Sequence, residues 1–99
     1  MNSTNLNLNE DQLQAVEQMA GTGFSISDIS ELLEVDCPAL QEEYNNNQSL
    51  VYKRYRKGFL KASFELRQRI FKDAGHGSSP AQTLAKKIMD DAEFKLQNQ

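Results

Sequence analysis

The chain has 99 residues, a formal net charge of −3 and a hydrophobic content of 38%. This length suits one small domain, or a small domain with a long helix, and so low an apolar content makes a folded monomer marginal. A single cysteine, Cys37, excludes an internal disulfide and fits a reducing compartment. No apolar run is long enough to cross a bilayer, and the polar start is not a signal peptide. We therefore expect a cytoplasmic protein without a membrane partner.

The charge is sorted by segment. Residues 1–52 contain nine acidic side chains and no lysine or arginine, whereas residues 53–72 contain eight basic side chains and one acid. The remainder, residues 73–99, is nearly balanced. The sequence thus predicts a basic helix that follows an acidic N-terminal region. The function depends on which of these two regions binds the partner.

The chain begins with an asparagine-rich segment, residues 1–8, that has little to bury and is expected to form a disordered tail. A helix start follows at once. Asn9 can cap the helix and Gln12, three residues later, can complete a capping box. This first helix is expected to end at Gly21 or Gly23, since glycine favours the conformation that terminates helices.

Two more short helices follow at tight turns. Ser25 is expected to cap a helix over residues 26–34, and Asp36 a helix over residues 37–44. The apolar residues that the second helix is expected to bury are Ile29, Leu32 and Leu33. Three short helices in so few residues predict a trihelical domain over residues 9–47.

A long helix is predicted over residues 49–74. Gly58 inside it predicts a close helix–helix contact, because glycine in a helix interior costs about 1 kcal/mol relative to alanine. Its apolar side chains cover roughly 200° of its circumference, far more than an ordinary surface helix needs, so it requires partners on two sides. A glycine-rich turn ends it, and Pro80 opens a fifth helix over residues 80–96. We expect these two helices to pack antiparallel as a hairpin, residues 48–99, that mediates oligomerisation. The candidate interface residues are Phe59, Leu60, Phe64 and Phe71. With no strand signal in competition, the predicted fold class is all-α.

Residues 23–40, GFSISDISELLEVDCPAL, resemble a helix-turn-helix motif, with a capping serine and apolar positions that would set the crossing of the second and third helices. Two positions depart from the usual pattern. Ser30 stands where a small alanine is commonest, and Glu34 where the turn often has glycine. The alternative interpretation is a trihelical packing unit with no nucleic-acid role.

Candidate DNA contacts come from two helices. On the third helix, Gln41 could bind an adenine edge and Glu42 a cytosine amino group. The trihelical unit has no cation to neutralise phosphates, so these must come from the fourth helix or from several subunits together. The candidates on the fourth helix are Arg54, Lys57 and Lys61. The alternative is that this basic face is merely solvated, or pairs with the acidic unit of a neighbouring subunit.

No catalytic, metal or cofactor site is expected. His76 is the one histidine and lies between two glycines, and Cys37 has no histidine nearby in the sequence. No Cys/His spacing fits a zinc site, and no glycine-rich loop fits a phosphate cradle. These observations predict a protein that is not an enzyme.

Two parts of the chain together resemble one family. The first is the segment 23–40. The second, Tyr52–Met89, reads YKRYRKGFLKASFELRQRIFKDAGHGSSPAQTLAKKIM. It is similar to the long helix, glycine-containing break and following helix of the small terminase subunits of tailed phages and of related phage helix-turn-helix proteins. The positions that carry the similarity are Tyr55, Gly58, Leu66, Arg67, Phe71, Ala74, Gly77 and Ala81.

The resemblance implies a DNA-packaging adaptor of phage or prophage origin, acting in the host cytoplasm. In that family the N-terminal helices recognise the packaging site on double-stranded DNA. The following helices assemble a homo-oligomeric ring that presents the DNA to the large terminase subunit. The acidic third helix of this chain departs from that pattern. The alternative is a protein–protein adaptor or scaffold whose trihelical unit docks a protein rather than DNA.

Overall fold

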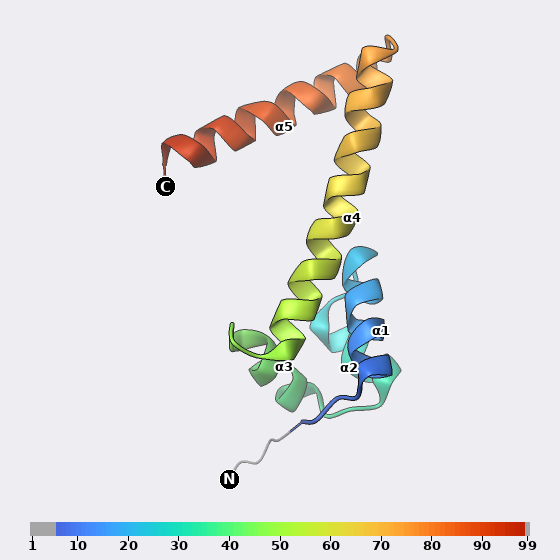
Figure 1. Ribbon diagram of the computed structural model, residues 1–99, viewed down its shortest axis with the longest axis vertical. Helices are drawn as coiled ribbons and strands as arrows, with labels where there is room; N and C mark the ends of the chain where they lie inside the picture. Colours follow the sequence, from blue (N-terminus) through green and yellow to red (C-terminus); the bar gives the residue numbers. More distant parts are fainter. Residues whose placement is uncertain (1–5, 99) are drawn as a thin grey trace. The chain divides into compact units, whose positions relative to one another are not determined.

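The computed structural model describes residues 6–98, and these form five helices and no strand (Figure 1). The helices are α1 (Glu10–Gly21), α2 (Ile26–Leu33), α3 (Cys37–Asn45), α4 (Leu50–Gly75) and α5 (Ser79–Gln97). The all-helical prediction is confirmed. The predicted helix ends also agree closely with the observed ones, because most of them rest on local capping signals.

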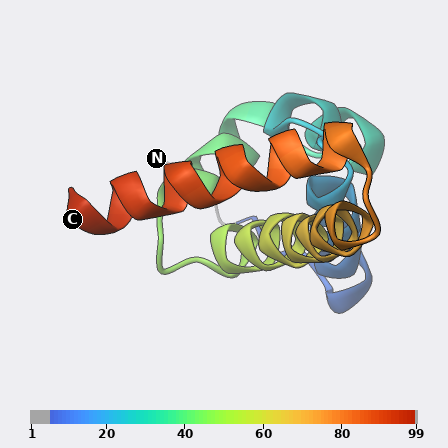
Figure 2. The same ribbon diagram turned by 90° about the horizontal axis from the view of Figure 1, so that it is seen from above.

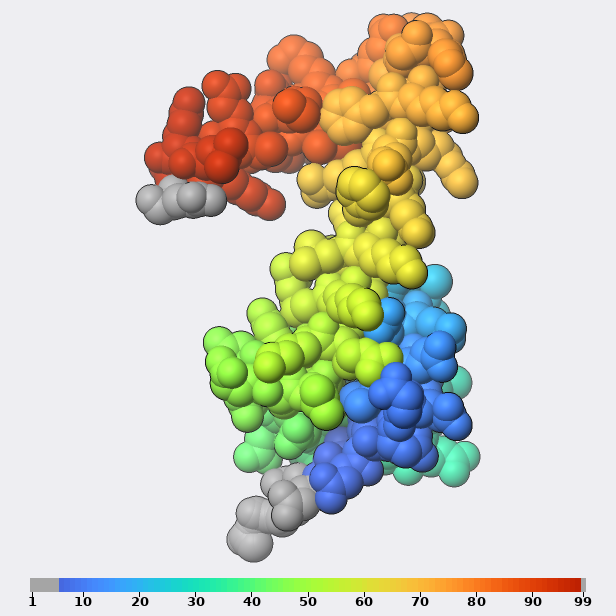
Figure 3. Space-filling view, viewed as in Figure 1, coloured from blue at the N-terminus to red at the C-terminus, as the bar shows by residue number. Residues whose placement is uncertain are grey.

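Two compact units divide the chain, one up to Ser63 and one from Phe64 onward, and the division falls inside α4. The sequence instead placed the boundary between residues 47 and 48. The difference arises because the first turns of α4 pack into the first unit, where Val51 is only 2% exposed and Gly58 is buried. The space-filling view shows these turns lying against the N-terminal helices (Figure 3).

The first three helices begin at the caps that the sequence predicts. Oδ1 of Asn9 accepts a hydrogen bond from the backbone N–H of Gln12 at 2.7 Å, and Oε1 of Gln12 accepts one from the backbone N–H of Asn9 at 2.9 Å. Ser25 and Asp36 each accept a hydrogen bond, at 3.1 Å, from the backbone N–H three residues later. Such caps contribute about 1 kcal/mol each, which matters for helices as short as α2 and α3.

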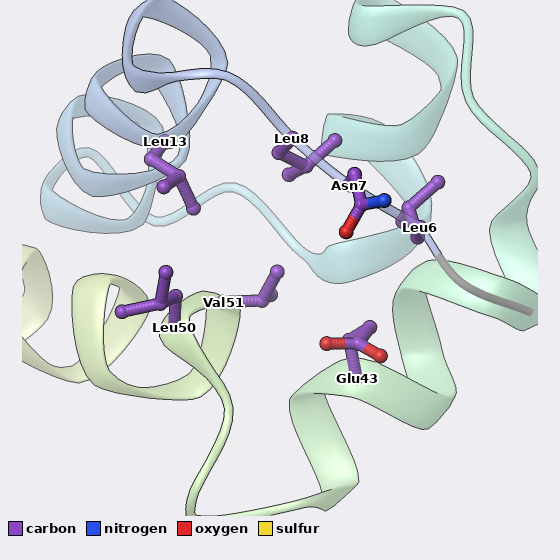
Figure 4. Close-up of a pocket in the computed structure, with 7 residues that line it drawn as sticks. All are labelled: Leu6, Asn7, Leu8, Leu13, Glu43, Leu50 and Val51. Carbon is purple, nitrogen blue, oxygen red and sulfur yellow. The ribbon is translucent and has the colours of Figure 1, made fainter.

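The core of the first unit draws on all four of its helices. Its buried residues are Leu13, Val16, Ile26, Ile29, Leu40 and Val51. Leu6 and Leu8 pack against this cluster and line, with Leu50, a cavity of about 150 Å³ (Figure 4). Residues 6–8 therefore differ from the disordered tail that was expected, because these two leucines find apolar partners; residues 1–5 lie outside the described part.

The prediction that α2 buries Leu32 was wrong, since this side chain is 61% exposed. On a helix with 3.6 residues per turn, Leu32 lies about 60° beyond Ile29, at the edge of the buried face. Ser30 lies within that face and is 3% exposed. Its hydroxyl donates to the carbonyl of Ser27 at 2.7 Å, so a serine is accommodated where an alanine is commonest.

The turn between α2 and α3 depends on a left-handed residue. Glu34 has φ 57° and ψ 44°, and it is the one non-glycine residue with positive φ in the described chain. Its conformation brings the N–H of Val35 within 3.0 Å of the carbonyl of Ser30, which closes the end of α2. Glu34 thus adopts the left-handed conformation that glycine usually provides at the end of a helix.

The second unit consists of the turns of α4 from Phe64 onward and α5. Ser78 caps α5, and Nε2 of Gln82 donates to the carbonyl of Ala74 at 3.1 Å. Figures 1 and 2 show α5 leaving the end of α4 crosswise, whereas the sequence predicted that it packs antiparallel along α4. Only Ala81 and Ala85 of α5 are buried, and both lie in its first two turns.

This arrangement leaves many apolar side chains of the second unit without an intramolecular partner. The exposed ones are Phe64, Leu66, Phe71, Leu84, Met89, Phe94 and Leu96. So many exposed large apolar side chains are unusual on a soluble monomer, and apolar surface that gathers into a patch is typical of interaction surfaces.

Candidate nucleic-acid and protein interfaces

The outer face of α3 is free of the core. Leu40 is fully buried, which directs the neighbouring Gln41 and Glu42 to the surface, where both are exposed. The amide of Gln41 donates to Oδ1 of Asn45, one turn later, at 3.2 Å. The two candidate base-contacting residues are thus accessible, on a face that carries no basic side chain.

Arg54 differs from the other candidate cations because two carboxylates of α1 already bind it. Its Nε lies 2.8 Å from Oε1 of Glu17, and its Nη2 lies 3.0 Å from Oε2 of Glu10. The third guanidinium nitrogen, Nη1, donates to Oε1 of Glu10 at 3.1 Å. The Arg54 and Glu17 side chains are only 21% and 18% exposed.

These contacts shift the pKa values of Glu10 and Arg54. The hydrogen bond from Arg54, followed by its charge, holds the pKa of Glu10 below the usual glutamate range. The hydrogen bonds to Glu10 and Glu17 raise the pKa of Arg54. Arg54 is therefore a clamp that joins α4 to α1, and its charge is already compensated.

Lys57 and Lys61 are exposed, and Lys53 extends them by one turn. We call these three residues the lysine row. None of them takes part in an ion pair within residues 6–98. Sequence reasoning did not include Lys53, although its spacing of four residues from Lys57 was a sufficient signal.

The lysine row and the outer face of α3 lie on different sides of the first unit. Tyr44 of α3 packs on α4, with its ring centroid 5.7 Å from that of Tyr52 and 5.0 Å from that of Tyr55. At 100° per residue, the three lysines of the row lie about 100–180° around α4 from these two tyrosines. One copy of the chain therefore does not present the row and α3 on a single surface.

The close approach predicted at Gly58 is confirmed. A Cβ added there would overlap the backbone of Glu17 in α1, and one added at Gly21 would lie 3.2 Å from the Gly58 carbonyl oxygen. The hydroxyl of Tyr55 also donates to the carbonyl of Phe24, at 3.0 Å. Together with the Arg54 clamp, these contacts fix the first turns of α4 against the N-terminal helices.

The four candidate interface residues are all exposed to solvent. The exposed fractions of Phe59, Leu60, Phe64 and Phe71 are 45%, 51%, 60% and 39%. The guanidinium carbon of Arg56 lies 5.6 Å from the Phe59 ring centroid and covers part of that ring. The other three have no such cover, so they are the most costly of the set to leave in water.

Sequence reasoning missed a shallow groove on α2. Four residues line its volume of about 230 Å³: Phe24, Asp28, Glu31 and Leu32. The signal was present in the sequence, since Leu32 falls outside the i, i+3, i+4, i+7 pattern that starts at Ile26 and runs through Ile29, Ser30 and Leu33. The groove combines two exposed apolar side chains with two carboxylates.

Neither a metal site nor a membrane-spanning helix is found among the described residues. Within residues 6–98, no three His, Cys, Asp or Glu side chains are placed to hold a metal ion. Over the same range, none of the helices has the length and apolarity required to cross a membrane. Cys37 is half-buried at the start of α3, and His76 is exposed in the turn after α4.

Comparison with known proteins returned no match to a family model, to a curated protein or to a solved structure.

Proposed function

We propose that the chain is a non-enzymatic DNA-binding adaptor that works as a homo-oligomer, of the kind that small terminase subunits provide in phage DNA packaging. In this proposal α2 and α3 form a helix-turn-helix, α3 contacts double-stranded DNA, and a large terminase subunit is a further partner. The proposal rests on the resemblance of residues 23–40 and 52–89 and on the surfaces described above.

The observation that carries the proposal is the lysine row. Lys53, Lys57 and Lys61 are spaced one turn apart on α4, they are exposed, and they have no ion-pair partner in the described chain. Phosphate neutralisation by such side chains supplies most of the non-specific affinity for DNA. The compensated Arg54 does not belong to this surface.

Assembly is an integral part of the proposal. Because the row and α3 lie on different sides of one first unit, a single copy would offer DNA either cations or base-contacting residues. Several copies around one duplex can offer both at once. The uncovered side chains of Leu60, Phe64 and Phe71 are the proposed means of assembly.

The test is the affinity of the assembled protein for a fluorescent DNA duplex, measured by anisotropy across a range of salt concentrations. We expect binding that weakens steeply with salt, because cations released from DNA drive it. A protein that is assembled but binds no duplex at low salt would contradict the DNA-binding proposal and leave self-assembly standing.

A second candidate function is a protein–protein adaptor whose first three helices dock a protein. The acidity of these helices favours it. They contain no lysine or arginine, and the nearest guanidinium, that of Arg54, is bound by Glu10 and Glu17. This candidate predicts a partner interface whose affinity barely responds to salt where the contact is apolar.

A further inference from the structure

The groove on α2 has a size and lining that suit inserted side chains. Its volume of about 230 Å³ is below the roughly 300–1,000 Å³ of a small-molecule pocket. Leu32 is 61% exposed and Phe24 37% exposed at its walls. Both are large apolar residues in a unit whose other apolar side chains are mostly covered, so filling the groove would remove exposed apolar surface from water.

The walls of the groove are held in place by the fold. The carbonyl of Phe24 accepts the Tyr55 hydroxyl at 3.0 Å, and its N–H donates to the carbonyl of Met19 at 3.1 Å. The opposite wall is α2 itself, whose start is fixed by the Ser25 cap. A preformed groove needs little ordering when a partner enters, which favours binding.

The charge of the groove selects a basic partner. Asp28 and Glu31 line it, and neither forms an ion pair within residues 6–98. A partner that brings an arginine or lysine beside an aromatic or aliphatic side chain would satisfy both features. A purely apolar segment would leave the two carboxylates unpaired, and an acidic segment would be repelled by them.

The chain itself carries such a segment on α4. Phe64, Arg67 and Phe71 follow one another at spacings of three and four residues, which places them on one face of the helix, and all three are exposed. We call them the α4 stripe. It lies in the part of the sequence where basic residues are concentrated, and its apolar–basic–apolar order complements the groove.

We infer that the α2 groove of one copy of the chain receives the α4 stripe of a second copy, with Phe64 or Phe71 inserted between Phe24 and Leu32 and Arg67 against Asp28 and Glu31. The inference rests on the self-assembly proposed above and specifies which residues form the contact between two copies. Groove and stripe are different surfaces, so each copy offers one of each. Two copies that exchange both contacts form a twofold dimer, and copies that each contact a different neighbour form a closed ring or an open filament.

The test uses two variants that each block one side of the contact. Leu32→Glu blocks the groove, and Phe64→Glu blocks the stripe; both residues are about 60% exposed, so neither change disturbs the core. Each variant alone should weaken self-association by about tenfold or more, as expected for a residue at the centre of an interface. An equimolar mixture should give a one-to-one heterodimer, because one intact groove and one intact stripe remain.

Matched controls separate this contact from general effects of added charge. Leu50→Glu places the same substitution at a residue of equal exposure (62%) outside the groove, and Phe94→Glu does so (66%) outside the stripe. Neither control should change the mass measured by light scattering. Asp28→Asn combined with Glu31→Gln should weaken association at low salt and have less effect at high salt.

The outcomes are distinguishable. If Leu32→Glu remains fully assembled, the groove is not the contact and either another protein fills it or nothing does, while self-assembly stands. If both variants dissociate but their mixture forms no heterodimer, groove and stripe are not partners. A wild-type protein that is monomeric would overturn both this inference and the self-assembly in the proposed function.

Discussion

Gly58 of α4 lies directly against the backbone of Glu17 in α1. A Cβ built on Gly58 would stand within 2.7 Å of the Glu17 carbonyl carbon, a distance that no relaxed side chain occupies. The glycine therefore allows two helix backbones to approach more closely than any other residue would permit. Gly21 contributes to the same contact from α1, where an added Cβ would lie 3.3 Å from Ala62.

The first prediction concerns this contact. Gly58→Ala should destabilise the protein by about 1–3 kcal/mol, because the obstacle is backbone and overpacking of this kind forces helices apart. Chemical denaturation monitored by circular dichroism measures the change. Gly75→Ala in the same helix is the control: nothing lies within 4 Å of its added Cβ, so stability should stay the same or rise slightly.

The second prediction concerns the turn after α2. Glu34 adopts a left-handed conformation that costs a residue with a side chain roughly 1–2 kcal/mol. Glu34→Gly should remove most of this cost and raise the free energy of unfolding by about 0.5–1 kcal/mol, the remainder being offset by the flexibility of glycine in the unfolded chain. Glu34→Ala, which keeps the strain, should not stabilise. Equal effects of the two changes would refute the assignment of strain.

The third prediction ranks the two carboxylates that bind Arg54. Glu17→Gln should lower the melting temperature more than Glu10→Gln, because the Glu17 side chain is 18% exposed whereas that of Glu10 is 73% exposed and its ion pair is screened by water. Thermal unfolding at low salt compares the two variants. An equal or reversed order would show that Arg54 does not act as the clamp described.

The fourth prediction is a pH dependence. The pKa of Glu10 is lowered in the folded protein by Arg54, so its contribution to stability is present above the ordinary glutamate pKa of about 4.3 and disappears as the pH falls through the lower, folded value. The melting temperature of the wild type minus that of Glu10→Gln should be positive at neutral pH and shrink on acidification. A difference that grows towards acid pH would contradict the direction of the shift.

Local signals allowed much of the fold to be predicted. The caps at Asn9, Ser25 and Asp36 operate within one helical turn, so the sequence located the helix starts. The contact at Gly58 could also be predicted, because a glycine inside a helix is costly unless bulk is excluded there.

The rest depends on tertiary contacts that no local pattern specifies. The capture of Arg54 by Glu10 and Glu17 requires α1 and α4 to meet in one particular register. The crosswise course of α5 depends on which apolar face finds a partner, and both helices of the second unit carry apolar residues on several sides. Leu32 is exposed because it lies about 60° around α2 from the buried Ile29. The hydrophobic pattern alone did not show on which side of the buried face's edge it would fall.

The central claim is that the assembled protein binds DNA through the lysine row, and the salt dependence of binding tests it most directly. Lys53, Lys57 and Lys61 changed together to Gln should lower the affinity for any duplex. The change should also flatten the plot of log affinity against log salt by about one unit for each phosphate that is no longer neutralised. The matched triple change of Lys86, Lys87 and Lys95 on α5, which removes the same charge, should leave the slope unchanged. Equal slopes for the two triple variants and the wild type would contradict the account.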